Sequence, residues 1–167
     1  MDIVKLVKKS KKGNDIAFST LIKNYEKDLY RVAIAITKNN EDALDCIQET
    51  ILKAYTNIKN LRQEKYFKTW LIKILINQCN YTVEKNRKSS NCFNENIHNS
   101  YMDNSAEIEI KSIINNLEEE LKILIILYYY EDMGISDISE ILKIPKGTIK
   151  SRLSRARGKL KEMIDIN

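Results

Sequence analysis

The chain has 167 residues, of which 43% are hydrophobic and 31% are charged, and its formal net charge is +5 at pH 7. No run of about 18 apolar residues occurs, so we expect no helix inserted in a membrane, and the N-terminus lacks the apolar core of an export signal. The four Gly and one Pro fall below typical frequencies of about 7% and 5%, which leaves few residues for tight turns. These features predict a cytoplasmic, all-α protein.

The cysteines and the histidine predict neither disulfides nor metal. Cys46, Cys79 and Cys92 are odd in number and lack paired spacing, which is typical of reduced thiols in a cytoplasm. No C-x-x-C motif occurs, and the one histidine, His98, has no neighbouring ligand in the sequence. We therefore expect no metal site and no cofactor.

The first strong helical spacing of apolar residues covers residues 15–36, and the next predicted helix covers residues 41–57. At 100° per residue, Asp42, Asp45 and Glu49 share one face of this second helix. We expect its apolar side chains to pack on the opposite face: Leu44, Ile47, Ile51 and Tyr55. The acidic face is either an ordinary solvated surface or a docking surface for a basic partner.

A third helix is predicted from about Lys65, after a cationic segment, residues 59–66, that carries an aromatic side chain. Aromatic rings among Lys and Arg can stack on unpaired bases while the cations hold the backbone. The alternative is that Phe67 and Trp70, three residues apart on one helix face, belong to the core. Both interpretations hold if only one edge of Trp70 is exposed.

Residues 88–106 read KSSNCFNENIHNSYMDNSA, in which nine of nineteen residues are Asn or Ser. This composition predicts a flexible linker between two small helical domains, residues 1–87 and 107–167. In the second domain we expect helices at about residues 106–115, 117–131, 136–142 and 147–164. Ser136 is the expected N-cap of the third of these helices.

The end of the chain predicts a helix-turn-helix, because a short helix, a Pro145 break and a basic helix follow one another. Residues 143–161 contain eight Lys or Arg and no acid. Apolar residues from Ile149 to Met163 fall on one face of the last helix. Near its N-terminus the opposite face carries side chains that can meet base edges in a major groove: Lys150, Ser151, Ser154 and Arg155.

Three segments resemble the extracytoplasmic-function (group IV) RNA polymerase sigma factors of the sigma-70 family. EDALDCIQETILKAY is similar to the family's D-A-x-D-x-x-Q-E-x-F, with Ile51 where Phe is usual. FKTWLIKILIN is similar to F-x-x-W-L-x-x-I-A-x-N, with Leu75 at the small position, and IPKGTIKSRLSRARGKL is similar to P-x-G-T-V-x-S-R-x-x-R-A-R. Together with the linker, the resemblance spans nearly the whole chain in the expected order.

The resemblance implies a factor that is not an enzyme and that directs core bacterial RNA polymerase to promoter DNA. The acidic helix would dock on the coiled coil of the largest polymerase subunit through four residues: Asp42, Asp45, Gln48 and Glu49. The first domain would bind the melted −10 strand through seven: Leu61, Arg62, Lys65, Tyr66, Lys68, Trp70 and Asn77. The helix-turn-helix would read the −35 duplex through six: Lys146, Thr148, Lys150, Ser151, Ser154 and Arg155. An anti-sigma factor, often membrane-anchored, usually holds such proteins inactive.

Two other classes of protein are alternatives to a sigma factor. A helix-turn-helix repressor or activator would use its N-terminal block to dimerise or to sense a ligand, and it would bind palindromes as a two-fold dimer. A nucleic-acid enzyme would need paired catalytic carboxylates, a metal cluster or a phosphate-binding loop, and the sequence shows none of these. The repressor or activator is the alternative that the sequence leaves open.

Overall fold

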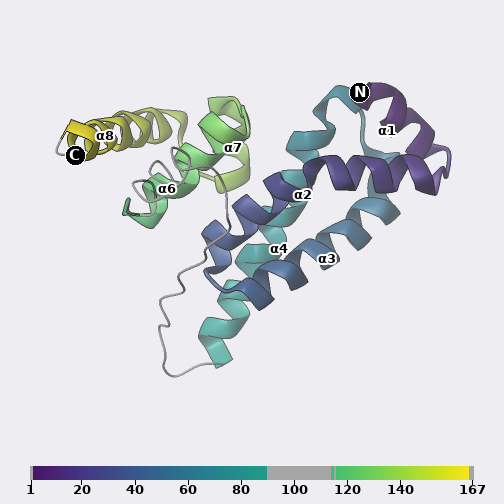
Figure 1. Ribbon diagram of the computed structural model, residues 1–167, viewed down its shortest axis with the longest axis horizontal. Helices are drawn as coiled ribbons and strands as arrows, with labels where there is room; N and C mark the ends of the chain where they lie inside the picture. Colours follow the sequence, from purple (N-terminus) through teal and green to yellow (C-terminus); the bar gives the residue numbers. More distant parts are fainter. Residues whose placement is uncertain (1, 90–113, 115, 166–167) are drawn as a thin grey trace. The chain divides into compact units, whose positions relative to one another are not determined.

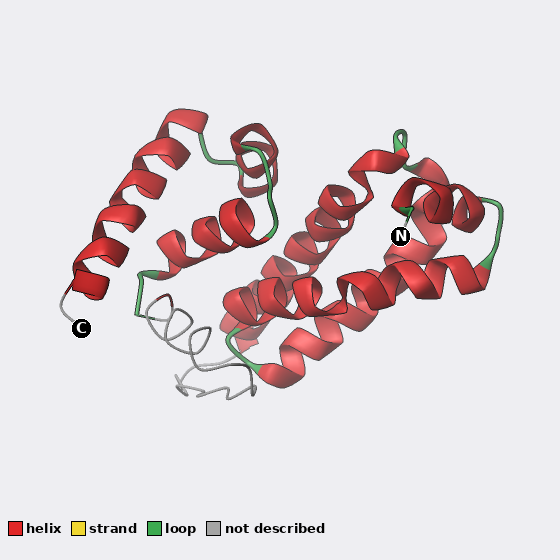
Figure 2. Cartoon of the chain, turned by 45° about the horizontal axis from the view of Figure 1, so that its top comes forward, coloured by secondary structure: helices red, strands yellow, loops and turns green. Residues whose placement is uncertain are grey.

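The computed structural model describes residues 2–89, 114 and 116–165 (Figure 1). The chain divides into two compact units, Met1–Glu95 and Asn96–Asn167. The described parts of both units consist of helices and loops, without strands (Figure 2), so the predicted all-α fold with two helical domains is confirmed. None of the described helices has the length and apolar character needed to span a membrane. Residues 90–106 of the predicted linker and most of the helix expected at residues 106–115 lie outside the described residues, whereas Lys88 and Ser89 are helical.

Unit 1 is a bundle of three long helices closed at one end by a short one (Figure 1). Its helices are α1 (Ile3–Lys11), α2 (Asp15–Thr37), α3 (Asn40–Asn57) and α4 (Phe67–Ser89). Between α3 and α4 lie two single 3-10 turns, η1 (Ile58–Asn60) and η2 (Glu64–Tyr66). Because α2, α3 and α4 all pack on one another, their apolar faces form one core, which includes fully buried Leu21, Leu29, Phe67, Leu71 and Leu75.

Helix α1 was not predicted from the sequence. Its start is fixed by Asp2, whose side chain accepts a hydrogen bond from the Lys5 amide at 3.0 Å. Val7 and Ser10 are its buried residues, and the Ser10 hydroxyl is satisfied because it donates to the Leu6 carbonyl at 2.9 Å. The helix packs on α2 and reaches both 3-10 turns. It therefore supports the segment that leads into α4.

Side-chain caps explain where α2 and α3 begin. The Asn14 side chain accepts from the Ala17 amide at 2.8 Å, and the Asn39 side chain accepts from the Asp42 amide at 3.0 Å. Lys38 ends α2 in the left-handed conformation, with φ of 56°. The neighbouring residues Lys38 and Asn39 thus define the turn between α2 and α3. This turn determines which face of α3 packs on the bundle.

Unit 2 contains α6 (Glu119–Ile125), which continues as a π-helical turn, η3 (Ile126–Tyr130), followed by α7 (Ile135–Leu142) and α8 (Lys146–Asp165). Its core includes Leu121, Leu124, Leu127, Ile138 and Ile149, all at most 1% exposed. The expected N-cap at Ser136 is wrong, because Gly134 precedes the first helical residue and Ser136 lies inside the first turn of α7.

The turn between α7 and α8 is closed by hydrogen bonds rather than by proline alone. Lys143 ends α7 with φ of 56°, and the Ser139 hydroxyl donates to the Ile144 carbonyl at 2.7 Å. The Pro145 carbonyl then accepts from the Ile149 amide at 3.1 Å, which begins α8. The helix-turn-helix expected from the sequence is therefore present, with α8 as its second helix.

Candidate functional site

The solvent face of α3 combines acidic and apolar side chains. The buried residues of this helix are small: Ala43, Cys46, Thr50 and Ala54. Helical rotation places six residues on the opposite side, which we call the α3 surface: Leu44, Asp45, Gln48, Glu49, Leu52 and Tyr55. Leu44, Leu52 and Tyr55 are 44%, 60% and 49% exposed. The predicted packing of Leu44 and Tyr55 into the core is wrong.

Small residues on the inner face of α3 explain this orientation. They let the helix axis approach α2 and α4 closely, so large side chains are not needed to fill the space. The Thr50 hydroxyl, fully buried, donates to the Cys46 carbonyl at 2.7 Å and so leaves no unsatisfied donor. Large apolar residues that would be expected inside are consequently available to a partner.

Two contacts hold the ends of α3. The Asn86 amide of α4 donates to the Asp42 carboxylate at 3.0 Å, and Asp42 is half-buried whereas Asp45 and Glu49 are exposed. Near the other end, the Tyr55 hydroxyl donates to Asp15 at 2.7 Å and its ring packs edge-on against Phe18. That hydrogen bond also raises the pKa of the Tyr55 phenol.

The segment from η1 to the start of α4 exposes cations and aromatic rings. Arg62, Lys65 and Tyr66 are exposed, and the Lys65 ammonium lies 4.8 Å from the centre of the Tyr66 ring. Leu61 is only 6% exposed, so its side chain belongs to the core and not to this surface. Lys68 lies 3.3 Å from the Asp28 carboxylate of α2, which ties its ammonium to the bundle.

Trp70 and Asn77 continue the same exposed side along α4. Phe67 is fully buried, whereas Trp70 is half-buried and packs against it with ring centres 5.9 Å apart. Asn77 is exposed two turns further on. We call these four exposed residues and half-buried Trp70 the α4 surface: Arg62, Lys65, Tyr66, Trp70 and Asn77. Sequence reasoning missed Tyr81, which is 63% exposed one turn beyond Asn77.

Helix α8 presents the basic side chains singled out in the sequence. Ile149, Leu153 and Ala156 are buried against unit 2. Lys146, Lys150, Ser151, Ser154 and Arg155 are exposed. Thr148 is half-buried, and its carbonyl accepts from the Ser151 hydroxyl at 2.9 Å. The helix can therefore offer one cationic side to an anionic partner.

Acids at the start of α6 meet part of this basic helix, which the sequence did not reveal. The Glu118 carboxylate accepts from Arg155 at 2.8 Å and from Lys159 at 2.6 Å, and Glu120 lies 2.8 Å from Arg152. The Lys159 hydrogen bond, together with the charge of Arg155, holds the pKa of Glu118 below its usual value of 4.5.

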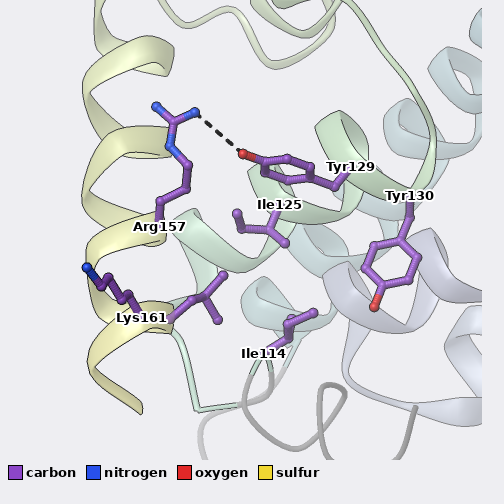
Figure 3. Close-up of a pocket in the computed structure, with 7 residues that line it drawn as sticks. Ile114, Ile125, Tyr129, Tyr130, Arg157 and Lys161 are labelled. Atoms are coloured by element: carbon purple, nitrogen blue, oxygen red, sulfur yellow. Dashed lines mark hydrogen bonds between the residues drawn. The ribbon is translucent and has the colours of Figure 1, made fainter. Parts of the chain in front are cut away.

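Unit 2 also has an apolar depression of about 510 Å3 next to α8. Ile114, Ile125 and Leu160 line it together with Tyr129, Tyr130, Arg157 and Lys161. Figure 3 shows the Arg157 guanidinium turned toward the Tyr129 hydroxyl, at 3.5 Å. The lining therefore combines apolar and aromatic side chains with two cations of α8.

The two thiols that the structure describes in unit 1 are buried in its core. Cys46 and Cys79 are at most 1% exposed, and the Cys46 thiol lies 3.3 Å from the Thr82 hydroxyl. Burial, with Cys46 beside it, raises the pKa of the Cys79 thiol far above its usual value, so the Cys79 thiol is not poised as a nucleophile. The described residues contain no group of three or more side chains that could ligate a metal.

Comparison with known proteins finds two family matches and several relatives. Residues 21–89 match Sigma-70 region 2, and residues 107–160 match Sigma-70, region 4. The chain is 33% identical to the ECF RNA polymerase sigma-E factor of Haemophilus influenzae over 96% of this chain and 92% of that one. It is 30% identical to the RNA polymerase sigma factor SigV of Bacillus subtilis over 89% of this chain and 91% of that one.

Solved structures share the fold. The sigma factor RpoE of Bartonella quintana, solved in complex with the anti-sigma factor NepR, is 27% identical and superimposes with a TM-score of 0.72 over 90% of this chain and 98% of that one. CnrH, solved with the cytosolic domain of CnrY, is 20% identical and has a TM-score of 0.67 over 99% and 98%. The second likeness concerns the fold alone.

Proposed function

Since the chain belongs to the extracytoplasmic-function group of the sigma-70 family, it is a promoter-directing transcription initiation factor and not an enzyme, and we propose how its surfaces divide that work. The α3 surface binds core RNA polymerase, the α4 surface binds the melted −10 strand, and α8 reads the −35 duplex. The family membership also favours this function over the dimeric repressor or activator that the sequence left open.

The observation that carries the proposal is the exposure of acids and large apolar residues together on α3. Asp45 and Glu49 repel DNA phosphates, so this face suits a protein partner that is basic and partly apolar. Leu44, Leu52 and Tyr55 supply apolar area that a docked partner would bury. We assign Asp45, Gln48 and Glu49 to direct contact with the polymerase coiled coil. Asp42, bonded to Asn86, contributes from the edge of the surface.

The α4 surface suits unpaired DNA because it alternates cations with aromatic rings. Arg62 and Lys65 would hold the backbone while Tyr66 and Trp70 stack on bases, with Asn77 offering hydrogen bonds. Lys68 adds positive charge from its place beside Asp28. Extruding a base costs a few kcal/mol of lost stacking, which these contacts must offset. Buried Leu61 has a supporting role under this surface.

The exposed start of α8 fits the major groove of a duplex. Ser151 and Ser154 are small, so the helix can approach base edges closely, while Lys150 and Arg155 can donate to guanine. Lys146 and Thr148 lie in the first turn, where backbone amides also favour a phosphate. One good Arg–guanine pair would supply about 1–3 kcal/mol of discrimination.

The proposed partners are therefore core polymerase, promoter DNA and an anti-sigma protein. The last follows from the RpoE relative, which was solved with an anti-sigma factor. In this family such inhibitors are often membrane-anchored, so a membrane-bound inhibitor is part of the proposal. The place of action would be the cytoplasm, where the polymerase works.

Transcription reconstituted with core polymerase tests the assignment of the α3 surface. The Glu49→Lys chain should bind core more weakly, by tenfold or more if the contact behaves as a buried charge pair, and should lose promoter-specific transcripts. The matched control is Glu26→Lys, because Glu26 is an exposed acid on α2, outside the α3 surface. Equal loss in both variants would show that overall charge, and not this surface, governs core binding.

A further inference from the structure

The cations of α8 fall on two sides that differ in their neighbours. Helical rotation places Arg152, Arg155 and Lys159 on the side that meets the start of α6. Each of these three forms an ion pair there, with Glu118 or Glu120. On the other side lie Lys146, Lys150, Arg157 and Lys161, for which the described part of the chain provides no acid partner. Two carboxylates thus offset part of the charge of the three cations on one side of α8.

Glu118 is at the centre of these ion pairs. Both its oxygens accept from the Arg155 guanidinium, at 2.8 and 2.9 Å, and one also accepts from the Lys159 ammonium at 2.6 Å. A single carboxylate therefore engages two cations one turn apart on α8. Arg155 is also one of the residues proposed to reach the duplex, so its guanidinium has an internal partner before DNA arrives.

These contacts are exposed enough to exchange. The side chains of Arg155 and Glu118 are 58% and 51% exposed, and ion pairs in such settings are weak and screened by salt. A DNA phosphate can therefore replace the carboxylate at Arg155 or Lys159. Until it does, Glu118 cancels part of the positive field and repels the phosphates that approach this side.

We propose that Glu118 is a specificity-determining residue that restrains sequence-independent binding of DNA duplex by α8. Phosphate contacts are the same at every site, so cations that bind only phosphates raise affinity without sequence information. An internal carboxylate that competes with phosphates for Lys159, and for Arg155 wherever no guanine is within reach of its guanidinium, lowers this part of the binding. Base contacts from the other side of α8 and from Ser151 and Ser154 then supply a larger share of the binding free energy. Repulsive elements sharpen other specific interfaces in the same way.

This inference rests on the proposed role of α8 in duplex binding, and the substitution that tests it is Glu118→Gln. Glutamine keeps the size of the side chain but removes its charge. The start of α6 should survive, because the Glu118 side chain makes no capping hydrogen bond and its carbonyl accepts from the Leu121 and Lys122 amides. Glu162→Gln is the matched control: Glu162 is exposed on α8, and its substitution changes the net charge equally.

The probe is a B-DNA duplex of about 20 base pairs of mixed sequence, titrated with the full chain over a range of salt. We expect Glu118→Gln to bind about fivefold more tightly than Glu162→Gln at low salt. The slope of log affinity against log salt should steepen by about one to two units, because one or two more cations meet phosphates. Circular dichroism checks that both variants keep their helices.

The same substitution in an Arg155→Gln, Lys159→Gln background separates pairing from overall charge. There Glu118→Gln should act no differently from Glu162→Gln, because the paired cations are gone. Equal affinity and slope for Glu118→Gln and Glu162→Gln in the otherwise native chain would overturn the inference, as would an undiminished effect in the double background. Absence of salt-dependent duplex binding by the unsubstituted chain would instead overturn the proposed role of α8.

Discussion

The Lys11 ammonium lies 2.8 Å from the Glu64 carboxylate and joins α1 to the turn that precedes α4. Helix α1 contacts both 3-10 turns of this segment, so the pair anchors the backbone from which Arg62, Lys65 and Tyr66 project. The hydrogen bond from Lys11 holds the pKa of Glu64 below its usual value of 4.5. Residues outside the Sigma-70 region 2 match therefore help to shape the α4 surface.

Replacing Lys11 by Gln should loosen this turn without unfolding the bundle. Amide hydrogen exchange of residues 62–66 should become faster, while the melting temperature changes little because exposed ion pairs contribute little to stability. Lys12→Gln is the control. Lys12 is exposed, and it caps the end of α1 through its backbone amide, which the substitution keeps. In the native chain the contact is complete above pH 4.5 and weakens as the pH falls through the lowered pKa of Glu64. Unchanged exchange in Lys11→Gln would refute this role.

The orientation of α3 shows where sequence reasoning stops. The helix carries two apolar stripes, one of small residues such as Ala43 and Cys46, and one of large residues such as Leu44 and Ile51. The side of the helix opposite the acids lies between these two stripes. Helical periodicity alone therefore does not show which stripe packs into the core. The choice depends on how closely α2 and α4 approach, which is a tertiary property. The sequence pattern places the larger stripe roughly opposite the acids, and Leu44 of this stripe is exposed.

Other elements were predictable for clear physical reasons. The helices that became α2, α4 and α8 have long apolar periods, and the break at Pro145 defines the helix-turn-helix. Helix α1 has only nine residues, and its many lysines hide the short apolar spacing of Ile3, Leu6 and Val7. The contact of Glu118 with Arg155 joins residues 37 apart, and no local pattern in a single sequence reveals such a pair.

Leu52 provides a test of the α3 surface that does not depend on charge. It is 60% exposed, so Leu52→Ser should change the free energy of unfolding by no more than about 0.5 kcal/mol. If Leu52 lies in the polymerase interface, the same change should weaken core binding by about 1 kcal/mol or more, roughly fivefold. Ile16→Ser is the matched control, because Ile16 is 80% exposed on α2. Fluorescence anisotropy measures the core binding of both variants. Equal weakening by Leu52→Ser and Ile16→Ser would show that Leu52 does not lie in the interface.

Trp70 allows the two proposed DNA surfaces to be observed separately. It is the only tryptophan in the chain, it is half-buried on α4, and unit 2 contains none. Stacking of a base on its ring should quench its emission when single-stranded promoter DNA binds. A short duplex carrying only the −35 region should bind without this quenching. Tyr66→Ala should weaken the single-strand effect, whereas Ser154→Ala should leave it unchanged. Quenching by the duplex alone would contradict the division of surfaces.

The protonation of Glu118 gives a final test of its pairing with α8. Lys159 is the main cause of its lowered pKa and Arg155 the next, so Lys159→Gln should move the pKa of Glu118 back toward 4.5. Lys161→Gln should have little effect, since Lys161 faces the apolar depression on the other side of α8. Carboxyl-carbon NMR titration measures these shifts directly. Because the folded pKa is lowered, the pair is intact above pH 4.5 and is lost only as acid protonates the carboxylate. The protonation of Glu118 should therefore cause no change in duplex affinity between about pH 5 and pH 7. If Lys159→Gln left the pKa of Glu118 unchanged, the two side chains would not interact in solution.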